Sequence, residues 1–180
     1  MAKTATLKPF IRSWEGGFAN VKGDRGGATK WGVTIGTFRM VYGKDKTVDD
    51  LKAMTEEQWN HIFRIYFWEK WRADEITSQS IANILVDWVW ISGTGTIKKI
   101  QKLLGVAVDG VVGRKTIAAL NGYPDGQLAL FNRIKELRTA YINAIATGTQ
   151  AKFKKGWMRR LSGIQYGSLV YNDGTTVINK

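Results

Sequence analysis

The chain has 180 residues and a net charge of +12, and its 44% hydrophobic and 23% charged residues are ordinary for a globular protein. Because it has no cysteine and only one histidine, disulfides and thiol catalysis are excluded, and we expect neither a metal site nor another cofactor. The charge is uneven, since residues 1–79 carry +3 and residues 80–180 carry +9. A basic second half favours a polyanionic partner.

The first predicted helix covers residues 7–15 and ends in a carboxylate. Its buried face is formed by residues spaced three or four apart: Leu7, Phe10, Ile11 and Trp14. Gly16 and Gly17 are predicted to end the helix by adopting the left-handed conformation. Glu15 then lies at the negative end of the helix dipole beside apolar neighbours, and both features disfavour its charged form. A carboxyl group that keeps its proton near neutral pH can act as a general acid.

A glycine-rich loop follows and carries a second carboxylate. Asp24 lies nine residues after Glu15 and next to Arg25, in a polar setting where it should stay ionised. Two carboxyl groups with different surroundings are typical of glycoside hydrolases. The alternative is that Glu15 forms a salt bridge at a helix end and Asp24 forms a turn. Spacing alone does not decide between these interpretations.

The rest of the chain is predicted to be mainly helical. We expect the following elements: helices at 33–42, 55–70, 80–104, 114–120, 127–146 and 151–166, then a hairpin through 172–174. The glycines at 92–95 either break the helix at 80–104 into two helices or let another element pack closely against it. Asp87 falls on a strongly apolar helix and needs a partner, for which we expect a backbone group or a tryptophan N–H. His61 lies off the buried stripe of its helix, and no G-x-S-x-G motif is present, so a Ser-His-Asp triad is not expected.

Two motifs resemble those of a known family. The first, similar to the opening of the EGG-motif N-acetylmuramidases of glycoside hydrolase family 108, reads Glu15-Gly16-Gly17-Phe18 and then Asp24-x-Gly26-Gly27-x-Thr29-x-x-Gly32-Val33-Thr34. The second, similar to the peptidoglycan-binding region that accompanies that catalytic part, reads Leu104-Gly105-Val106-x-Val108-Asp109-Gly110-Val111-x-Gly113-x-x-Thr116. The family includes phage endolysins and secretion-associated muramidases. Together the two matches cover nearly the whole chain in the family's order.

The resemblance implies a mainly α, lysozyme-like fold with a small glycine-rich loop and β-hairpin lobe and a packed C-terminal helical region. It implies a catalytic region at 1–79 and a peptidoglycan-binding region at 80–180, which we expect to pack as one body. It also implies Glu15 as the catalytic acid, with Asp24 and Thr29 placing or activating water.

Four further residues are candidates for substrate binding. Trp31 lies beside Thr29 in the loop and could stack on a sugar ring. Gly26 and Gly27 would let the backbone approach a ligand closely. Asp109 belongs to the motif that resembles the wall-binding region.

The implied activity is hydrolysis of the β-1,4 bond between N-acetylmuramic acid and N-acetylglucosamine in peptidoglycan glycan strands. Anionic polymers of the cell envelope are a second candidate partner, and we expect no nucleic-acid partner. The alternatives are a lytic transglycosylase, which needs one carboxyl group and releases an anhydro sugar, and an inactive cationic wall-binding module. The presence of both Glu15 and Asp24 argues against an inactive module.

No secretory signal is evident, and the apolar run at 81–91 is too short to span a bilayer. We therefore expect a monomer without a membrane span that is made in the bacterial cytoplasm. It would reach the wall through a holin, through lysis or through dedicated export.

Overall fold

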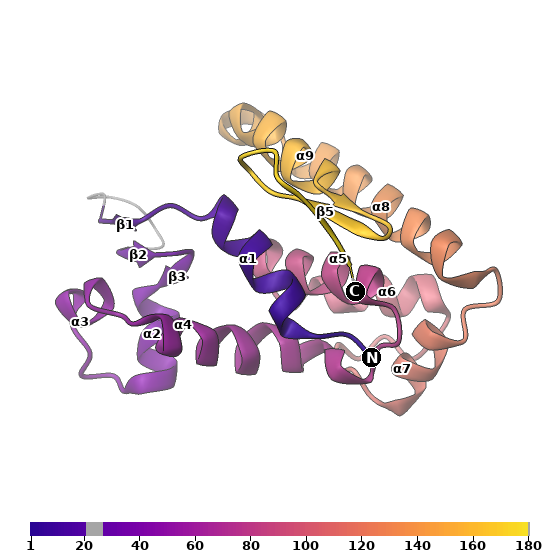
Figure 1. Cartoon of the computed structure of the whole chain (residues 1–180), viewed down its shortest axis with the longest axis horizontal. Helices are drawn as coiled ribbons and strands as arrows, with labels where there is room; N and C mark the ends of the chain where they lie inside the picture. Colours follow the sequence, from indigo (N-terminus) through magenta and orange to yellow (C-terminus); the bar gives the residue numbers. More distant parts are fainter. Residues whose placement is uncertain (21–26, 180) are drawn as a thin grey trace.

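The computed structural model describes residues 1–20 and 27–179, and these form a mainly helical fold with two small antiparallel sheets (Figure 1). The predicted mainly α class with a small hairpin lobe is confirmed. Within the described residues, no helix combines the length and the apolar character needed to cross a membrane.

The first half holds one small sheet and a series of short helices. Its elements are α1 (Thr4–Trp14), β1 (Phe18–Ala19), β2 (Thr29–Lys30), β3 (Val33–Thr34), α2 (Ile35–Tyr42), α3 (Val48–Lys52), α4 (Glu56–Phe63), the π-helix η1 (Arg64–Trp68) and the 3₁₀ helices η2 (Glu69–Trp71) and η3 (Ala73–Glu75). Thr55 and Gln58 form a capping box that opens α4 at the start of the helix predicted from residue 55.

The second half is built on longer helices and ends in a second small sheet. Its elements are α5 (Gln79–Ser92), α6 (Thr96–Leu104), α7 (Arg114–Asn121), α8 (Gly126–Ile145), the 3₁₀ helix η4 (Gly148–Phe153), α9 (Lys154–Ser162), β4 (Ile164–Gln165), β5 (Ser168–Val170) and β6 (Thr176–Ile178). Of the two alternatives for 92–95, the structure shows the break between helices, since α5 ends at Ser92 and Gly93 follows with φ 77°.

Helix α5 lies at the centre of the molecule. Every residue from Ser80 to Val89 is buried, because α1, η1, α8 and β4 pack around it. A helix enclosed on all sides must be apolar all round, and α5 is, apart from a few polar residues. Buried side chains from Ala2 to Leu169 belong to one hydrophobic cluster, so the core extends through both halves of the chain.

Three local predictions were wrong. The helix predicted at 151–166 ends at Ser162, and Ile164 and Gln165 form β4 instead. Val33 and Thr34 are not helical but form β3, because they pair with Lys30 and Thr29 across a tight turn. Gly16 and Gly17 do not adopt the left-handed conformation. Helix α1 ends instead because the backbone of Glu15 is extended, with φ −96° and ψ 137°.

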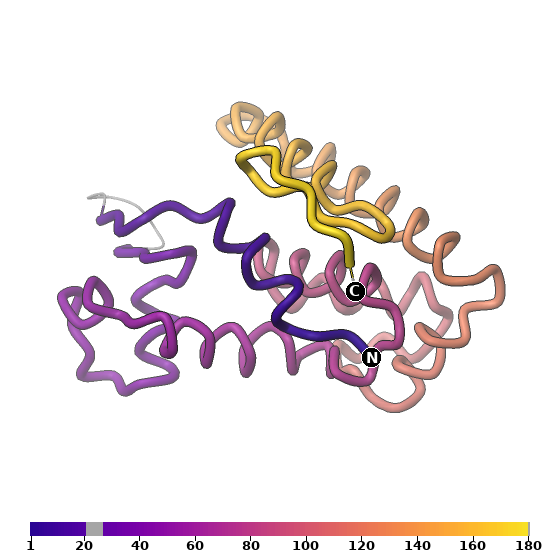
Figure 2. Tube along the Cα trace, viewed as in Figure 1, coloured from indigo at the N-terminus to yellow at the C-terminus, as the bar shows by residue number. Residues whose placement is uncertain are grey.

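The first helix and the last strands lie side by side although they are far apart in sequence. Figure 2 shows the indigo N-terminal helix passing beside the yellow C-terminal hairpin. The backbone N–H of Asn172 donates to Oγ of Ser13 at 3.2 Å, and the rings of Phe10 and Tyr171 are 6.3 Å apart. These contacts hold the C-terminal segment against the end of α1, where Glu15 lies.

Candidate active site

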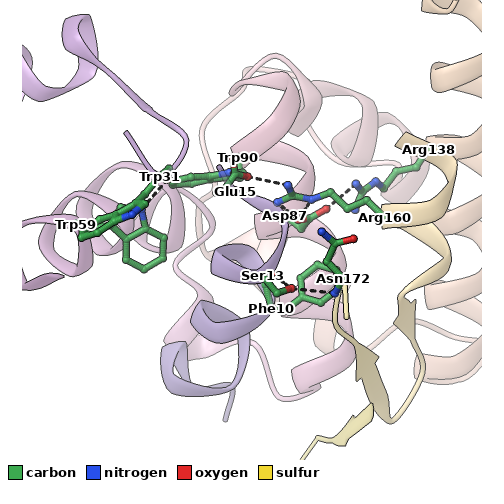
Figure 3. Close-up of polar contacts among 10 residues, drawn as sticks. All are labelled: Phe10, Ser13, Glu15, Trp31, Trp59, Asp87, Trp90, Arg138, Arg160 and Asn172. Carbon is green, nitrogen blue, oxygen red and sulfur yellow. Dashed lines mark hydrogen bonds and ion pairs between the residues drawn. The ribbon is translucent and has the colours of Figure 1, made fainter. Parts of the chain in front are cut away.

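Glu15 is the residue directly after α1, and its carboxylate lies at a junction of several elements. Its side chain is 16% exposed. Oε1 accepts a hydrogen bond from Nε1 of Trp90 on α5 and another from Nη1 of Arg160 on α9, both at 2.7 Å (Figure 3). One interpretation of the sequence placed apolar groups and the helix end beside this carboxyl, and the alternative was a salt bridge at the helix end; the structure shows a salt bridge. The structure adds a guanidinium from the opposite end of the chain.

The second oxygen of Glu15 faces a hairpin turn. Trp31 and Gly32 join β2 to β3, with φ values of 51° and 78°. A two-residue turn with two positive φ values matches the twist of the strands that it connects. A Cβ atom built on Gly32 would lie only 2.6 Å from Oε2 of Glu15 and 2.6 Å from Cζ2 of Trp90. Only glycine fits here, because any side chain would displace the carboxyl group.

Replacing Gly32 with alanine should therefore damage the site directly. The new methyl group would push Glu15 or Trp90 aside, and the left-handed backbone would add a cost of about 1–2 kcal/mol. We expect any activity that depends on the Glu15 carboxyl group to fall on the order of 10²-fold, the scale of a 1 Å misplacement. Gly93→Ala is a matched control, since its φ is also positive but nothing lies within 4 Å of its Cβ position. Equal losses of activity in the two variants would show that backbone strain alone is responsible.

Trp31 is held rigidly in an unfavourable backbone conformation. The guanidinium carbon of Arg12 lies 3.8 Å from the centre of its ring, and Nζ of Lys30 lies 4.2 Å from it. Its carbonyl accepts a hydrogen bond of 3.0 Å from Nε1 of Trp59. Strained residues of this kind persist where their surroundings fix them, and they are frequent at functional sites. A sugar stacking on Trp31 would share the ring with these two cations.

Trp90 connects the carboxylate to an aromatic cluster. Its ring packs at 4.5 Å from that of Phe67, and at 5.8 Å from those of Phe63 and Trp59. The indole therefore has a fixed orientation, with its N–H pointing at Glu15. This role of Trp90 as a hydrogen-bond donor to Glu15 was not predicted from the sequence.

A buried ionic cluster lies behind Glu15. Asp87 on α5 is fully buried, and its Oδ2 accepts from Nη2 of Arg138 on α8 at 2.8 Å. Its Oδ1 accepts from Nη2 and Nε of Arg160, at 2.8 and 3.0 Å. Arg138 also donates to the carbonyl of Ile84 at 2.8 Å. The expected partner of Asp87, a backbone group or a tryptophan N–H, is thus corrected to two arginines (Figure 3).

The charges of this cluster stabilise one another. Burial by itself raises the pKa of Asp87, but the guanidiniums of Arg160 and Arg138 outweigh it and hold that pKa below its usual value. Burial lowers the pKa of Arg138 despite its pairing with Asp87. Burial alone would also lower the pKa of Arg160, but Asp87 and Glu15 together raise it above its usual value.

The spacing of both arginines relative to apolar residues indicated that they are buried, although their charge suggested an exposed position. Arg138 lies four residues after Ile134 and four before Ile142, both of which are buried on α8. Arg160 lies three residues after Trp157 and next to buried Leu161. An arginine on an apolar stripe needs a buried acid, and Asp87 was the acid without a partner.

Two of the other predicted site residues lie on or just before β2. Thr29 is half-buried on β2, where it pairs with Ala19 and Thr34 beside the turn that contacts Glu15. Gly27 precedes β2 with φ 65°. Asp24 and Gly26 lie outside the described residues.

Asp109 lies apart from these residues, in the loop between α6 and α7. Its Oδ1 accepts from Nε2 of Gln101 at 2.7 Å and from the N–H of Val111 at 2.8 Å. These two hydrogen bonds lower the pKa of Asp109. Its described contacts therefore organise the loop itself. Among the described residues, no group of three or more His, Cys, Asp or Glu side chains is placed to hold a metal ion.

Comparisons with known proteins found matches over most of the chain. The glycosyl hydrolase 108 family model matches residues 9–93, and the model of a predicted peptidoglycan domain matches residues 95–162. The solved structure of Brucella abortus SagA is similar, with a TM-score of 0.75, 31% sequence identity and 87% of each chain covered. A search of curated proteins found no match.

Proposed function

We propose that this chain acts as an N-acetylmuramidase. It belongs to the glycosyl hydrolase 108 family and is a peptidoglycan-degrading glycoside hydrolase. It would hydrolyse the β-1,4 bond between N-acetylmuramic acid and N-acetylglucosamine. The observation that carries the proposal is the asymmetric environment of Glu15, with one oxygen held by two donors and the other facing the hairpin turn.

This asymmetry determines which oxygen of Glu15 can carry a proton. The indole N–H of Trp90 and the guanidinium of Arg160 are donors only, so a protonated Glu15 must carry its hydrogen on Oε2. Oε2 would then protonate the glycosidic oxygen as the bond to the sugar breaks. The side chain is partly exposed, as a group that meets a polymer must be.

A hydrolase also needs a group on the opposite face of the sugar that either activates a water molecule or forms a covalent intermediate. We propose Asp24 for this role, with the Thr29 hydroxyl assisting. Thr29 is on β2, the strand that leads into the turn at Trp31 and Gly32. A lytic transglycosylase uses the sugar's own hydroxyl and has no need of a second carboxylate.

Analysis of the products tests the proposal. Digests of purified sacculi should contain reducing N-acetylmuramic acid ends, which borohydride converts to muramitol and mass spectrometry detects. Asp24→Asn should slow the reaction far more than Thr29→Ala, with both variants folded. Anhydro-muramic acid ends would overturn the hydrolase assignment, and intact sacculi would favour a binding module. Full activity of a folded Asp24→Asn variant would remove Asp24 from the mechanism.

A further inference from the structure

The described residues place one guanidinium between the proposed catalytic acid and the buried core. Arg160 lies on α9, in the region matched by the peptidoglycan model, whereas Glu15 lies in the region matched by the hydrolase model. The two residues are 145 positions apart, and their side chains meet at 2.7 Å. The side chain of Arg160 is only 9% exposed, so this contact is shielded from solvent.

Arg160 uses each of its three nitrogens. Nη1 donates to Glu15, while Nε and Nη2 both donate to Oδ1 of Asp87. The guanidinium is planar and rigid, so fixing one edge on Asp87 also fixes the direction of Nη1. Asp87 in turn cannot move, because it is fully buried on α5 and paired with Arg138 of α8.

The backbone of α9 is also held close to α1. A Cβ atom on Gly163, at the end of α9, would lie 2.5 Å from the carbonyl oxygen of Val170 and 3.3 Å from Cε2 of Phe10. The N–H of Val170 donates to the carbonyl of Gly163 at 2.7 Å. This close packing sets the distance that the Arg160 side chain must span to reach Glu15.

We infer that Arg160 is a positioning residue of the active site: anchored on Asp87, it holds Oε1 of Glu15 and so presents Oε2 to the substrate. The C-terminal region therefore completes the catalytic apparatus in addition to any part it has in wall binding. This inference rests on the proposed role of Glu15. Although burial alone would lower the pKa of Arg160, its pairing with Asp87 and Glu15 raises that pKa and so favours the charged guanidinium.

Arg160→Lys is the sharpest test. A lysine keeps the positive charge for buried Asp87, but its single ammonium cannot reproduce the three-nitrogen fork that also holds Glu15. We expect the variant to fold. On solubilised glycan strands its kcat should fall by on the order of 10²-fold, the scale of a 1 Å misplacement, while KM stays within about twofold. Arg159→Lys is the control, because the guanidinium of Arg159, next to Arg160 in the sequence, donates to the carbonyl of Asn172 and not to Glu15.

Arg160→Ala, measured with and without added guanidinium ion at millimolar concentration, provides a second readout. The ion can occupy the vacated space between Glu15 and Asp87, so it should restore part of kcat in this variant, and it should not do so in Glu15→Gln. Melting curves report the folded fraction in each case. A loss of kcat that merely follows the folded fraction, without rescue, would show a structural role only and overturn the inference.

The Glu15→Gln variant distinguishes a failure of this inference alone from a failure of the proposed function. If that variant keeps its activity, both the role of Glu15 and the inference fall. If Glu15→Gln is inactive while Arg160→Lys retains the wild-type kcat, only the positioning role of Arg160 is overturned.

Discussion

Replacing Glu15 with glutamine should abolish nearly all release of reducing ends from peptidoglycan while leaving the fold intact. The amide oxygen can still accept from Trp90 and Arg160, which keeps the side chain in place. The amide has no acidic proton to give to the leaving oxygen. General-acid catalysis is typically worth about 10²–10⁴-fold, and we expect a loss in that range.

Reducing-end assays and melting curves on the same preparation check this result. Glu136→Gln is the matched control, because Glu136 is 68% exposed on α8 and makes only a long pair of 3.5 Å with Arg133. The control should keep full activity. A Glu15→Gln variant within a few-fold of wild type would remove Glu15 from the proposed acid role.

Replacing Asp87 with asparagine should cost the most stability. The substitution keeps the shape of the side chain but leaves Arg138, which is 1% exposed, with a buried charge and no acid beside it. Breaking a buried ion pair in this way costs about 3–5 kcal/mol. For a chain of this length each kcal/mol lowers Tm by roughly 2–4 °C, so a drop of about 6–20 °C is expected in thermal unfolding.

The effect should also depend on pH in a defined direction. Since the folded-state pKa of Asp87 lies below its unfolded value of about 3.9, the ionised form stabilises the fold fully above that pH. This contribution is lost as the pH falls through the folded-state pKa, so the difference between wild type and variant should narrow in acid. Asp45→Asn is the control, because Asp45 is 80% exposed and lies 4.0 Å from Lys46. Equal melting temperatures for the Asp87 and Asp45 variants would contradict the role of the buried cluster.

The sequence was informative wherever the determining signal is local. The buried stripe of Leu7, Phe10 and Ile11 predicted the helix that places Glu15 at its C-terminal end, and the start of α4 was predicted to within one residue. The glycine break after α5 was one of the two alternatives predicted there, for the same reason. Each of these features depends on residues a few positions apart, so a single sequence contains the evidence for it.

The features that organise the site depend on distant residues. No local pattern links Glu15 to Arg160 across 145 positions, and the run of lysines around α9 made Arg160 look like part of a solvated basic face. The turn at Trp31 was missed because tryptophan has no preference for a left-handed backbone. It adopts one here because Arg12, Lys30 and Trp59 hold it in place.

The arginine contact between the two matched regions limits how this protein can be recombined. A chimera that joined residues 9–93 to the C-terminal region of a relative would receive Glu15 and Asp87 from one parent and their guanidinium from the other. We expect this chimera to be fully active only if the incoming helix carries an arginine whose guanidinium reaches both Glu15 and Asp87. If Arg160 positions Glu15 as inferred, the two matched regions can be exchanged between relatives only where both parents provide this acid–arginine–acid contact.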